Sequence, residues 1–471
     1  MVFPSSGGSL KSKIPTGVMT CSKHLLDHTL NTFSPRVGFA WDPTKQGKMS
    51  VRGGFGIFFD KPSEQLYNDY FTNSPKFALG SACAQCGTNQ PLFALGTTSD
   101  PPYNYPLPPG IQPGLLPSGG LISGQASVTV ADRNLSPSYM ENWFFGVQRA
   151  VTGTTVAEVD YIGSVGRHLY AKYNVNRFAG DLIQNGGNFT GLAPGFGAIN
   201  YGQSSESSGY NGFTASVRQR ASHGVTLNAA YTFSKAIDQA SKLDGSEHVD
   251  AFNDSLSRGL ADFDVRQRLA FTTLWSLPSP HGSGFMNKLL GGWELTNVTI
   301  LQSGPPFSVI CTASFKPVFD TATPPNVIGN TGCDYNADGT NYDRPNTPSF
   351  GNTKTGLSRS DYLGGIFGCG GTALCGSIFP SPGLQEGNLG RNTFHGPGFA
   401  NTDFSVIKNL KIPWFIGGEG ANLQFRTEFF NVFNRVNLTQ VNSDIANLSN
   451  FGKSTGTYPA RDIQFALRIA F

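Results

Sequence analysis

Apolar and polar residues alternate strictly in several stretches of the chain. The pattern is clearest in the last eleven residues, where Ile463, Phe465, Leu467, Ile469 and Phe471 alternate with polar or small residues. The intervening positions are Asp462, Gln464, Ala466, Arg468 and Ala470. Successive side chains of a β-strand point to opposite faces of its sheet, so a period of two predicts a strand with one apolar face and one polar face.

Similar stretches recur upstream and give about eleven predicted strands in total. Their ranges are 35–41, 49–59, 142–148, 154–163, 213–220, 225–234, 264–277, 293–310, 401–411, 422–433 and 461–471. The pair 213–220 and 225–234 flanks a short turn at 222–224 and predicts a β-hairpin. A strand of about ten residues, tilted by about 40°, spans the apolar band of about 25 Å in an outer-membrane barrel, so these lengths suit a transmembrane sheet.

The segments between the predicted strands alternate between short and long. The shorter ones are 42–47, 150–153, 222–224, 278–292 and 412–421, and the longer ones are 60–136, 164–208, 234–263, 311–399 and 434–461. Loops of the second kind are uncommon in compact soluble domains but are expected on the extracellular side of a barrel with short periplasmic turns. The predicted fold is therefore all-β: an antiparallel up-and-down transmembrane β-barrel with long extracellular loops.

The composition agrees with a β-sheet and excludes other classes. Glycine, with 58 residues, and phenylalanine, with 37, are both abundant, and this pairing favours strands and turns over helices. No run of 18 apolar residues occurs, so a transmembrane helix is excluded. The formal net charge of +3 is too small to indicate nucleic acid as a partner.

Residues 1–32 carry Lys11, Lys13 and Lys23 but no continuous apolar core, so they contain no signal peptide. We expect this segment to be poorly ordered or to form part of a strand. The absence of a leader on an envelope-type protein predicts that the true N-terminal part lies upstream of Met1.

Several longer motifs resemble TonB-dependent outer-membrane receptors, specifically the Oar-like group. They are FSPRVGFAWDP (33–43), VRGGFGIFFD (51–60), YNGFTASVRQR (210–220), AYTFSKAID (230–238), DVRQRLAFT (264–272) and QFRTEFFNVFNRVN (424–437). The C-terminal Phe471 is similar to the signature by which such barrels are recognised for assembly. The resemblance covers nearly all of the chain from Phe33 onward.

The resemblance implies a barrel of about 22 strands that is plugged by an N-terminal domain. On this interpretation residues 33–471 are the C-terminal portion of the barrel, and the plug and the first half of the barrel are missing. The expected function is transport of a large nutrient, such as an oligosaccharide, peptide or metal chelate, across the cell outer membrane. The expected partners are outer-membrane lipid, the missing plug and barrel half, the TonB complex and the barrel assembly machinery.

Two other classes of protein remain open. One is a structural or adhesive outer-membrane surface protein that transports nothing. The other is a secreted β-sandwich or propeller, which includes some enzymes.

Arginines recur at positions that alternate with the apolar ones. On a lipid-facing surface each arginine would cost about 2–4 kcal/mol near the midplane, so they are predicted to face the lumen. This predicted polar wall consists of Arg52, Arg218, Arg220, Arg266, Arg268, Arg426, Glu428 and Arg468. It would hold a plug or guide an anionic substrate, or else it is a structural set of ion pairs with Glu428, Asp462 and their neighbours.

The segment Asp334, Asn336, Asp338 and Gly339 has the spacing of a calcium-binding loop. Pro345 stands where the loop would need a glutamate, so calcium bound through Asp334, Asn336 and Asp338 competes with an ordinary turn rich in Asp and Asn. No other cofactor is predicted.

The seven cysteines indicate an oxidising compartment, because most of them lie in glycine-, proline- or serine-rich stretches. The natural pairs are Cys83 with Cys86 and Cys369 with Cys375, and Cys311 with Cys333 is a third candidate. A redox or zinc motif at Cys83 and Cys86 is the rival interpretation, but no second CxxC or nearby histidine supports it.

No enzymatic site is predicted. Gly53, Gly54 and Gly56 lie inside a strand that no helix follows, which argues against a nucleotide-binding loop. The seven histidines show no convincing metal-ligand spacing, and the chain has no GxSxG nucleophile elbow.

Overall fold

The structure is a computed structural model. It describes residues 32–61, 126–132, 135–175, 196–241, 254–279, 284–310, 317–319, 327–330, 390–412, 420–444 and 450–470. Within these ranges the chain is almost entirely strands and connections, and its helices are the 3-10 helix η2 (Asp254–Ser257) and the α-helix α2 (Phe285–Leu290). In this part of the chain no helix has the length and apolar character needed to span a bilayer.

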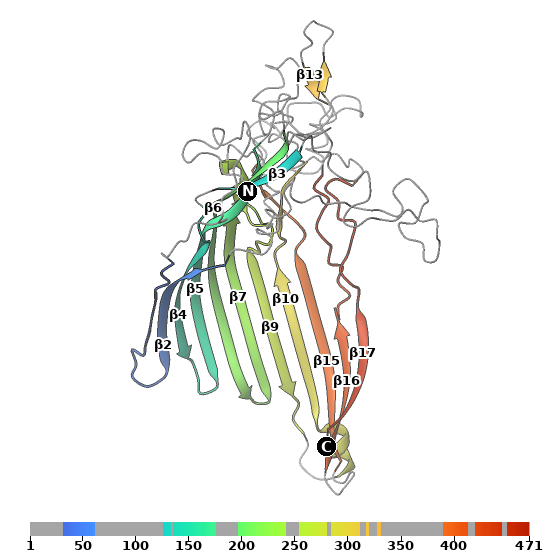
Figure 1. Ribbon diagram of the computed structural model, residues 1–471. Helices are drawn as coiled ribbons and strands as arrows, with labels where there is room; N and C mark the ends of the chain where they lie inside the picture. Colours follow the sequence, from blue (N-terminus) through green and yellow to red (C-terminus); the bar gives the residue numbers. More distant parts are fainter. Residues whose placement is uncertain are drawn as a thin grey trace, which may run out of the picture.

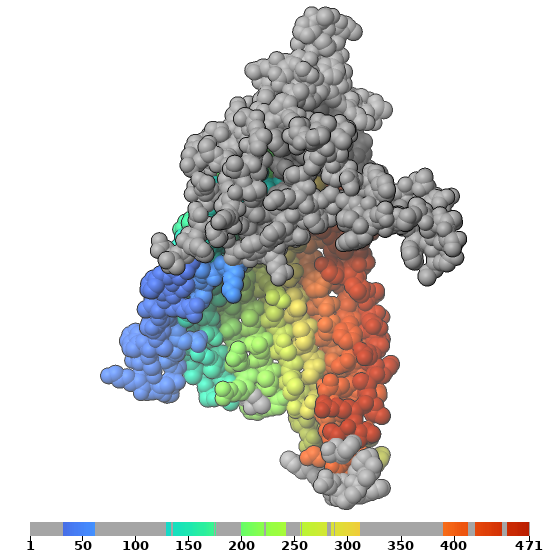
Figure 2. Space-filling view, in the orientation of Figure 1, coloured from blue at the N-terminus to red at the C-terminus, as the bar shows by residue number. Residues whose placement is uncertain are grey.

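One large sheet dominates the molecule (Figure 1). Its path contains eleven strands: β1 (Arg36–Trp41), β2 (Met49–Phe59), β4 (Tyr139–Ala150), β5 (Thr155–Asn174), β6 (Phe196–Ser222), β7 (Val225–Asp238), β9 (Gln267–Ser276), β10 (Trp293–Gln302), β15 (Phe399–Ile412), β16 (Ala421–Phe430) and β17 (Asp462–Ala470). Each strand pairs antiparallel with the next one along this path. Figure 2 shows the same strands side by side as one continuous wall.

The remaining strands are short. β3 (Ala126–Ala131) pairs parallel with β6, and β8 (Gly259–Leu260) pairs with the end of β7. Two small sheets combine β11 (Pro306–Phe307) with β14 (Phe394–His395), and β12 (Pro317–Phe319) with β13 (Val327–Asn330).

Every predicted strand range overlaps one of the eleven strands of the sheet path, and the all-β antiparallel fold is confirmed. The prediction for 293–310 was too long. β10 ends at Gln302, because Gly304 is followed by Pro305 and Pro306, which have no N–H group to donate to a neighbouring strand.

The range 164–208 was predicted to be a loop, and this prediction was wrong at both ends. β5 continues to Asn174 and β6 begins at Phe196, with a register irregularity between Gly166 and Leu169. The apolar alternation in this region is too short to predict a strand, and residues 203–208 in β6 are all polar. These extensions are held instead by β3, which pairs along the first residues of β6.

A small core lies between β3 and the extensions of β5 and β6. Its residues are almost fully buried: Val130, Ala131, Ala171, Tyr173, Val175, Ile199 and Tyr201. Burial, with the carboxylate of Asp132 beside it, raises the pKa of the Tyr201 hydroxyl above its usual value. The hydroxyl of Tyr201 therefore stays protonated and neutral inside this core.

The strand register sorts the side chains of the sheet onto two faces. The apolar face carries, from β1 to β17, Phe39, Phe55, Phe145, Tyr161, Phe213, Phe233, Leu269, Leu295, Phe404, Phe425 and Phe465. The polar face carries Arg36, Arg52, Gln148, Glu158, Arg218, Asn228, Arg268, Thr296, Ser405, Arg426 and Arg468. Because the two sets never exchange sides along the path, the alternation seen in single strands becomes a property of the whole sheet.

β10 departs from this pattern. Asn297 and Thr299 lie on the apolar face, while Val298 and Ile300 lie on the polar face. The Thr299 hydroxyl is 3.1 Å from Asn297 Oδ1 and 3.0 Å from Thr402 Oγ1. These polar groups therefore satisfy one another on an otherwise apolar surface.

The strand directions limit how the sheet can close. Ten antiparallel steps separate β1 from β17, so the two edge strands run in the same direction. Within the described residues these edges do not pair with each other. Direct closure would put two parallel strands together and break the antiparallel pattern.

The connections divide between the two ends of the sheet. The turns that follow β1, β4, β6, β9 and β15 lie at one end, the short-turn end, and the longer connections leave the other end, the long-loop end. This agrees with the predicted alternation of short and long segments. The C-terminus lies at the short-turn end (Figure 1).

Candidate functional site

The predicted polar wall lies on one face of the sheet. Register places Arg52, Arg218, Arg268, Arg426, Glu428 and Arg468 on the polar face. Arg220 follows Arg218 by two residues, and Arg266 precedes Arg268 by two, so both belong to the same alternation just beyond the paired positions. The structure therefore brings these residues to one surface, although they come from five strands.

Ion pairs join part of this wall. Arg52 pairs with Glu158 across the sheet, and Arg266 lies 3.6 Å from Asp264. Arg426 Nη1 lies 3.9 Å from Glu428 Oε1, and Arg426 Nε donates to Gln424 Oε1 at 2.6 Å. The structural interpretation of the arginines thus has support at these three positions.

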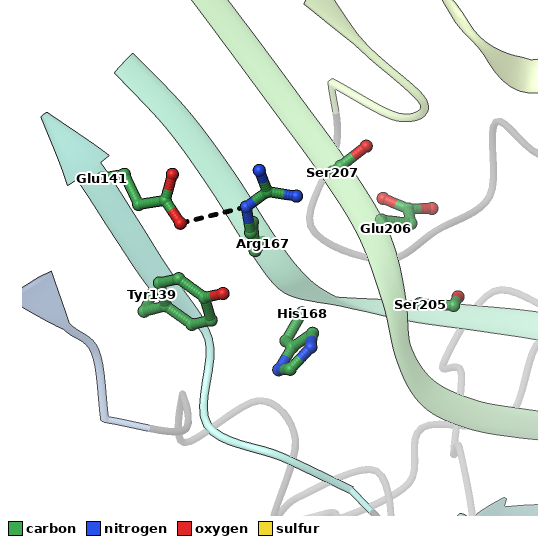
Figure 3. Close-up of a pocket in the computed structure, with 7 residues that line it drawn as sticks. All are labelled: Tyr139, Glu141, Arg167, His168, Ser205, Glu206 and Ser207. Carbon is green, nitrogen blue, oxygen red and sulfur yellow. Dashed lines mark hydrogen bonds and ion pairs between the residues drawn. The ribbon is translucent and has the colours of Figure 1, made fainter. Parts of the chain in front are cut away.

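A pocket opens where β4, β5 and β6 approach the long-loop end (Figure 3). Its volume is about 430 Å³, and it is lined by Tyr139, Glu141, Arg167, His168, Ser205, Glu206 and Ser207. Arg167 Nε donates to Glu141 Oε1 at 3.1 Å, and Glu206 is buried. A lining of two carboxylates, one guanidinium, one imidazole and two serine hydroxyls suits a polar ligand with several hydrogen-bonding groups.

The backbone of β5 shapes this pocket. His168 has a positive φ of 53°, at the point where the β5–β6 register shifts. The shift turns the imidazole edge-on to the Tyr139 ring, 5.4 Å between centroids, and the His168 carbonyl accepts the Ser138 hydroxyl at 2.8 Å. The pocket could not be predicted from the sequence, because residues 164–208 show no alternation that indicates a strand and were predicted to be a loop.

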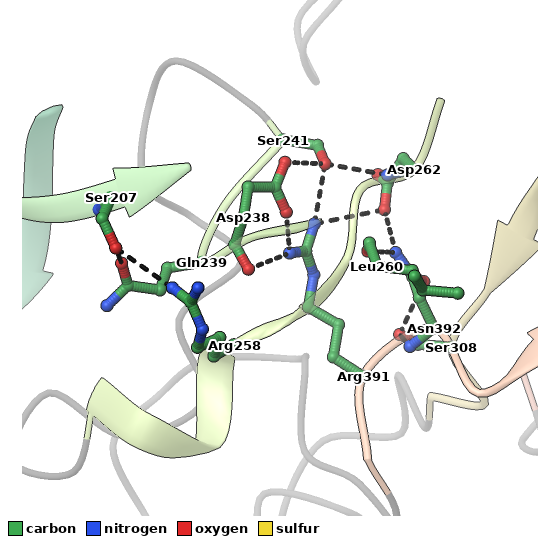
Figure 4. A network of polar contacts seen from close by, with 10 residues as sticks. All are labelled: Ser207, Asp238, Gln239, Ser241, Arg258, Leu260, Asp262, Ser308, Arg391 and Asn392. Carbon is green, nitrogen blue, oxygen red and sulfur yellow. Dashed lines mark hydrogen bonds and ion pairs between the residues drawn. The ribbon is translucent and has the colours of Figure 1, made fainter. Parts of the chain in front are cut away.

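A buried arginine ties the segments at the long-loop end together (Figure 4). Arg391, which is 4% exposed, pairs with Asp238 at the end of β7 and lies 3.3 Å from Asp262 Oδ1. Its Nη2 also donates to Ser241 Oγ at 2.8 Å. One side chain thus fixes three segments that are far apart in the sequence.

The next residue extends this network. Asn392 Nδ2 donates to the Leu260 carbonyl and to Asp262 Oδ1, both at 2.6 Å. Its backbone N–H donates to Ser308 Oγ at 2.9 Å. Asn392 has a positive φ of 53°, a backbone conformation that asparagine tolerates better than most residues.

The network also reaches the pocket. The Ser207 N–H donates to Gln239 Oε1 at 2.7 Å, and Arg258 Nη1 donates to Ser207 Oγ at 3.0 Å. Ser207 lines the pocket, while Gln239 follows Asp238 directly. A ligand in the pocket would therefore contact Ser207, which is hydrogen-bonded to Gln239 after β7 and to Arg258 before β8.

Several predicted sites lie outside the described residues. These are the seven cysteines, the calcium-like segment with Asp334, Asn336 and Asp338, and the C-terminal Phe471. In the part of the chain that the structure describes, no three His, Cys, Asp or Glu side chains are placed to hold a metal ion.

Comparison with known families now identifies the class of protein. The family model of the outer membrane beta barrel domain matches residues 1–464. The chain belongs to this family. Its location in the cell outer membrane, predicted from the alternation and the resemblance, is thereby confirmed.

Solved structures to which this outer-membrane barrel chain is similar share little sequence with it. The outer membrane transporter YddB from Escherichia coli is 10% identical, with a TM-score of 0.46 over 93% of this chain and 40% of that one. The FrpB iron transporter from Neisseria meningitidis is 11% identical, with a TM-score of 0.39 over 92% and 38%. The ferripyoverdine receptor of Pseudomonas aeruginosa is 10% identical, with a TM-score of 0.38 over 92% and 32%.

The chain thus spans about two fifths or less of the length of these transporters and receptors. They are described as transporters and a receptor. No curated protein matches the chain. The Oar-like subgroup and the complete count of about 22 strands stay predictions.

Proposed function

We propose that this chain is the C-terminal barrel portion of a TonB-dependent outer-membrane transporter of a large nutrient. The observation that carries the proposal is a single antiparallel sheet of eleven strands with one apolar and one polar face. A water-soluble sheet would have to cover the apolar face with other elements of the fold. A transmembrane sheet exposes it to lipid.

The apolar face is exposed in this way. Phe145 is 49% exposed, Phe213 45% and Phe465 66%, and these residues lie on three different strands. Most of the remaining strands also carry large apolar side chains with similar exposure. An uncovered apolar surface of this extent marks a contact with protein or membrane. In a chain of the outer membrane, hydrocarbon is the natural occupant.

The polar face would then line a watery interior. Its arginines, glutamates and amides can hydrate there or contact a plug, which explains why they are tolerated in the membrane-spanning strands. The ion pairs within the wall leave Arg218, Arg220, Arg268 and Arg468 without an ion-pair partner among the described residues. These four arginines are the groups best placed to meet a plug or an anionic substrate.

Strand direction supports a missing barrel portion. Because β1 and β17 run in the same direction, antiparallel closure needs an odd number of additional strands. Two copies of the sheet related by a two-fold axis along the membrane normal would again place β17 beside β1 in parallel. A further set of strands, with a plug inside, satisfies both edges and gives the complete transporter.

The pocket at the long-loop end supports the proposed range of substrates. Glu141, Arg167, His168, Ser205 and Glu206 offer several charges and hydrogen-bonding groups in an open cavity of about 430 Å³. Oligosaccharides, peptides and metal chelates present many such groups. By register Tyr139, Glu141 and Arg167 lie on the side of the sheet that carries the apolar face, so we propose that the pocket contributes to capture of one of these substrates at the outer side of the long-loop end.

A surface protein that binds without transport has one observation in its favour. The Arg391 network joins the segments from which the long loops leave the sheet, and loops fixed at their bases suit adhesion as well as capture. The two functions differ in whether bound material crosses the membrane.

Uptake assays in the native host separate them. A labelled malto-oligosaccharide, a labelled oligopeptide and a ferric hydroxamate are supplied to wild-type cells, to cells lacking the gene, and to wild-type cells treated with a protonophore. Transport predicts that uptake of at least one probe falls at least tenfold on deletion and on collapse of the proton gradient, while surface binding survives the protonophore. Unchanged uptake of all three probes, together with loss of surface binding on deletion, would reject transport in favour of adhesion.

A further inference from the structure

The helix α2 carries an apolar stripe that the fold does not cover. It lies in the connection between β9 and β10, at the short-turn end of the sheet (Figure 1). Phe285, Met286, Leu289 and Leu290 are between 48% and 76% exposed. At 100° per residue these four positions fall within a stripe of about 140°, and Lys288 lies on the other side of the helix.

The helix is fixed to the sheet by its C-terminal end. Lys408 Nζ donates to the carbonyls of Lys288 at 2.7 Å and Leu289 at 2.9 Å, and it also contacts the Gly291 carbonyl. The last carbonyls of a helix have no partner within it, and an ammonium group satisfies them and complements the helix dipole. The helix therefore does not need its apolar stripe to hold it in place.

Trp293 supports the same attachment. Its Nε1 donates to the Leu289 carbonyl at 2.9 Å, and the Lys408 ammonium lies 5.0 Å from the centre of its ring. Gly292 has a φ of +73°, and a side chain there would overlap the Asn409 carbonyl. The turn after α2 thus packs directly against β15.

Lys408 and Trp293 are directly paired across β10 and β15 and lie on the apolar face of the sheet. The helix that carries the exposed stripe is consequently attached to the face of the sheet that meets hydrocarbon. Tryptophan and lysine beside an apolar surface are typical of the membrane–water boundary, where the ring and the ammonium both reach polar surroundings. Short turns of outer-membrane barrels face the periplasm, which places α2 at the periplasmic boundary.

We propose that α2 is an interfacial anchor whose apolar stripe inserts among the phospholipids of the periplasmic leaflet. Lys408 and Trp293 set the depth and the direction of the stripe by holding the helix end. The anchor would fix the level of the barrel in the membrane beside β10 and β15. This inference rests on the outer-membrane location of the chain and does not depend on transport.

Photo-crosslinking in the assembled protein tests the anchor. p-Benzoyl-phenylalanine replaces Phe285 in the protein as it is made and assembled in its host, and digested peptides are examined by mass spectrometry after irradiation. The matched control places the same residue at Gln46, an exposed polar position in the short turn between β1 and β2. Phospholipid adducts are expected at 285 and several-fold fewer at 46.

Two further variants keep the result decisive. The probe at Phe213, in the centre of the apolar face, must give lipid adducts, so its failure would reject the membrane-facing sheet and not the anchor alone. Lys408→Met in the Phe285 probe background is expected to lower the lipid adducts several-fold, with assembly verified by heat-modifiable gel migration. Adducts at 285 with another protein, with a second copy, or with nothing, while Phe213 reports lipid, would overturn the anchor.

Discussion

Arg52 and Glu158 form an ion pair although a complete strand lies between them. Arg52 is on β2 and Glu158 is on β5, with β4 in the middle of the three. The β4 residue paired with Arg52 is Gly146, and a methyl group at Gly146 would overlap Asp160 Oδ1. The space that a side chain at Gly146 would fill is therefore occupied by the Asp160 carboxylate, and Arg52, Glu158 and Asp160 lie on one face of the sheet around this glycine.

Removal of this bridge is expected to destabilise the assembled barrel. Arg52→Met leaves Glu158 and Asp160 on one face without the cation, which should lower the free energy of unfolding by about 1 kcal/mol, since Arg52 is partly exposed. Urea unfolding in lipid vesicles measures the effect. The double variant Arg52→Met with Glu158→Gln should recover part of the loss. Gly146→Val should also lower stability, because its side chain would overlap the Asp160 carboxylate beside the bridge.

The matched control for this bridge is Arg218→Met. Arg218 shares the polar face, and it has no ion-pair partner among the described residues, so the expected change is below about 0.5 kcal/mol. Equal losses for Arg52→Met and Arg218→Met would show that general charge removal, and not the bridge, determines stability.

Neighbouring residues on β6 test the assignment of the two faces. Phe213 is on the apolar face between Tyr161 and Phe233, and Thr214 is on the polar face between Asp160 and Thr232. Phe213→Arg would place a charge in hydrocarbon at a cost of about 2–4 kcal/mol near the midplane, whereas Thr214→Arg would meet water and the Asp160 carboxylate. The assembled fraction on heat-modifiable gels should fall sharply for Phe213→Arg only, and a reversed order would assign the faces the other way round.

The strands of the sheet could be predicted from the sequence because each one must place apolar side chains on one face and polar side chains on the other. Phe465, Leu467 and Ile469 alternate with polar neighbours since one face meets lipid and the other does not. The arginines of the wall were predicted by the same rule, and their register onto one face follows from it. No tertiary information was needed for either result.

The site at the long-loop end could not be predicted in this way. Asp238 and Arg391 are separated by 153 positions in the sequence, and neither has a neighbouring pattern that indicates a buried ion pair. His168 takes part in the pocket only because the β5–β6 register shifts beside it. These features depend on contacts between distant segments, which a period of two does not encode.

We expect loss of the Arg391 guanidinium to loosen only the segments near residues 238–241, 262 and 390–393, from which the long loops leave the sheet. Arg391→Met leaves Asp238 and Asp262 without their cation, and loss of a buried partner typically costs about 3–5 kcal/mol. Because the network joins loop segments, we expect local opening with the sheet intact. Hydrogen exchange should accelerate in 238–241 and 390–393 but not in β9 or β10.

Two controls separate geometry from charge in this network. Arg391→Lys retains the charge but not the fork of donors that reaches Asp238, Ser241 and Asp262 together, so intermediate protection is expected. Arg258→Met removes a single exposed hydrogen bond to Ser207 and should change exchange little. Exchange that increases throughout the sheet in Arg391→Met would contradict the local role.

The turn between β1 and β2 predicts a pH dependence outside the membrane. Asp42 Oδ1 accepts the Thr44 hydroxyl at 2.6 Å and the Thr44 N–H at 2.9 Å, and Oδ2 accepts the Gly47 N–H at 2.7 Å. The Thr44 hydroxyl, with these backbone groups, holds the pKa of Asp42 below its ordinary value of 3.8. The stabilisation from this carboxylate is therefore complete above pH 3.8 and is lost as the pH falls through the lowered pKa of the folded state.

The Thr44 hydroxyl is the strongest cause of this shift, so Thr44→Ala should raise the pKa of Asp42 toward 3.8. Gln46→Ala, in the same turn, keeps the Asp42–Thr44 contacts and should leave the titration where it is. Carbon NMR of the Asp42 carboxyl in the assembled protein measures both. The difference in unfolding free energy between wild type and Asp42→Asn should also shrink as the pH falls below 3.8, because both side chains are then neutral. Identical titration curves for wild type and Thr44→Ala would mean that the hydroxyl does not stabilise the carboxylate, and that the backbone N–H groups alone organise this turn.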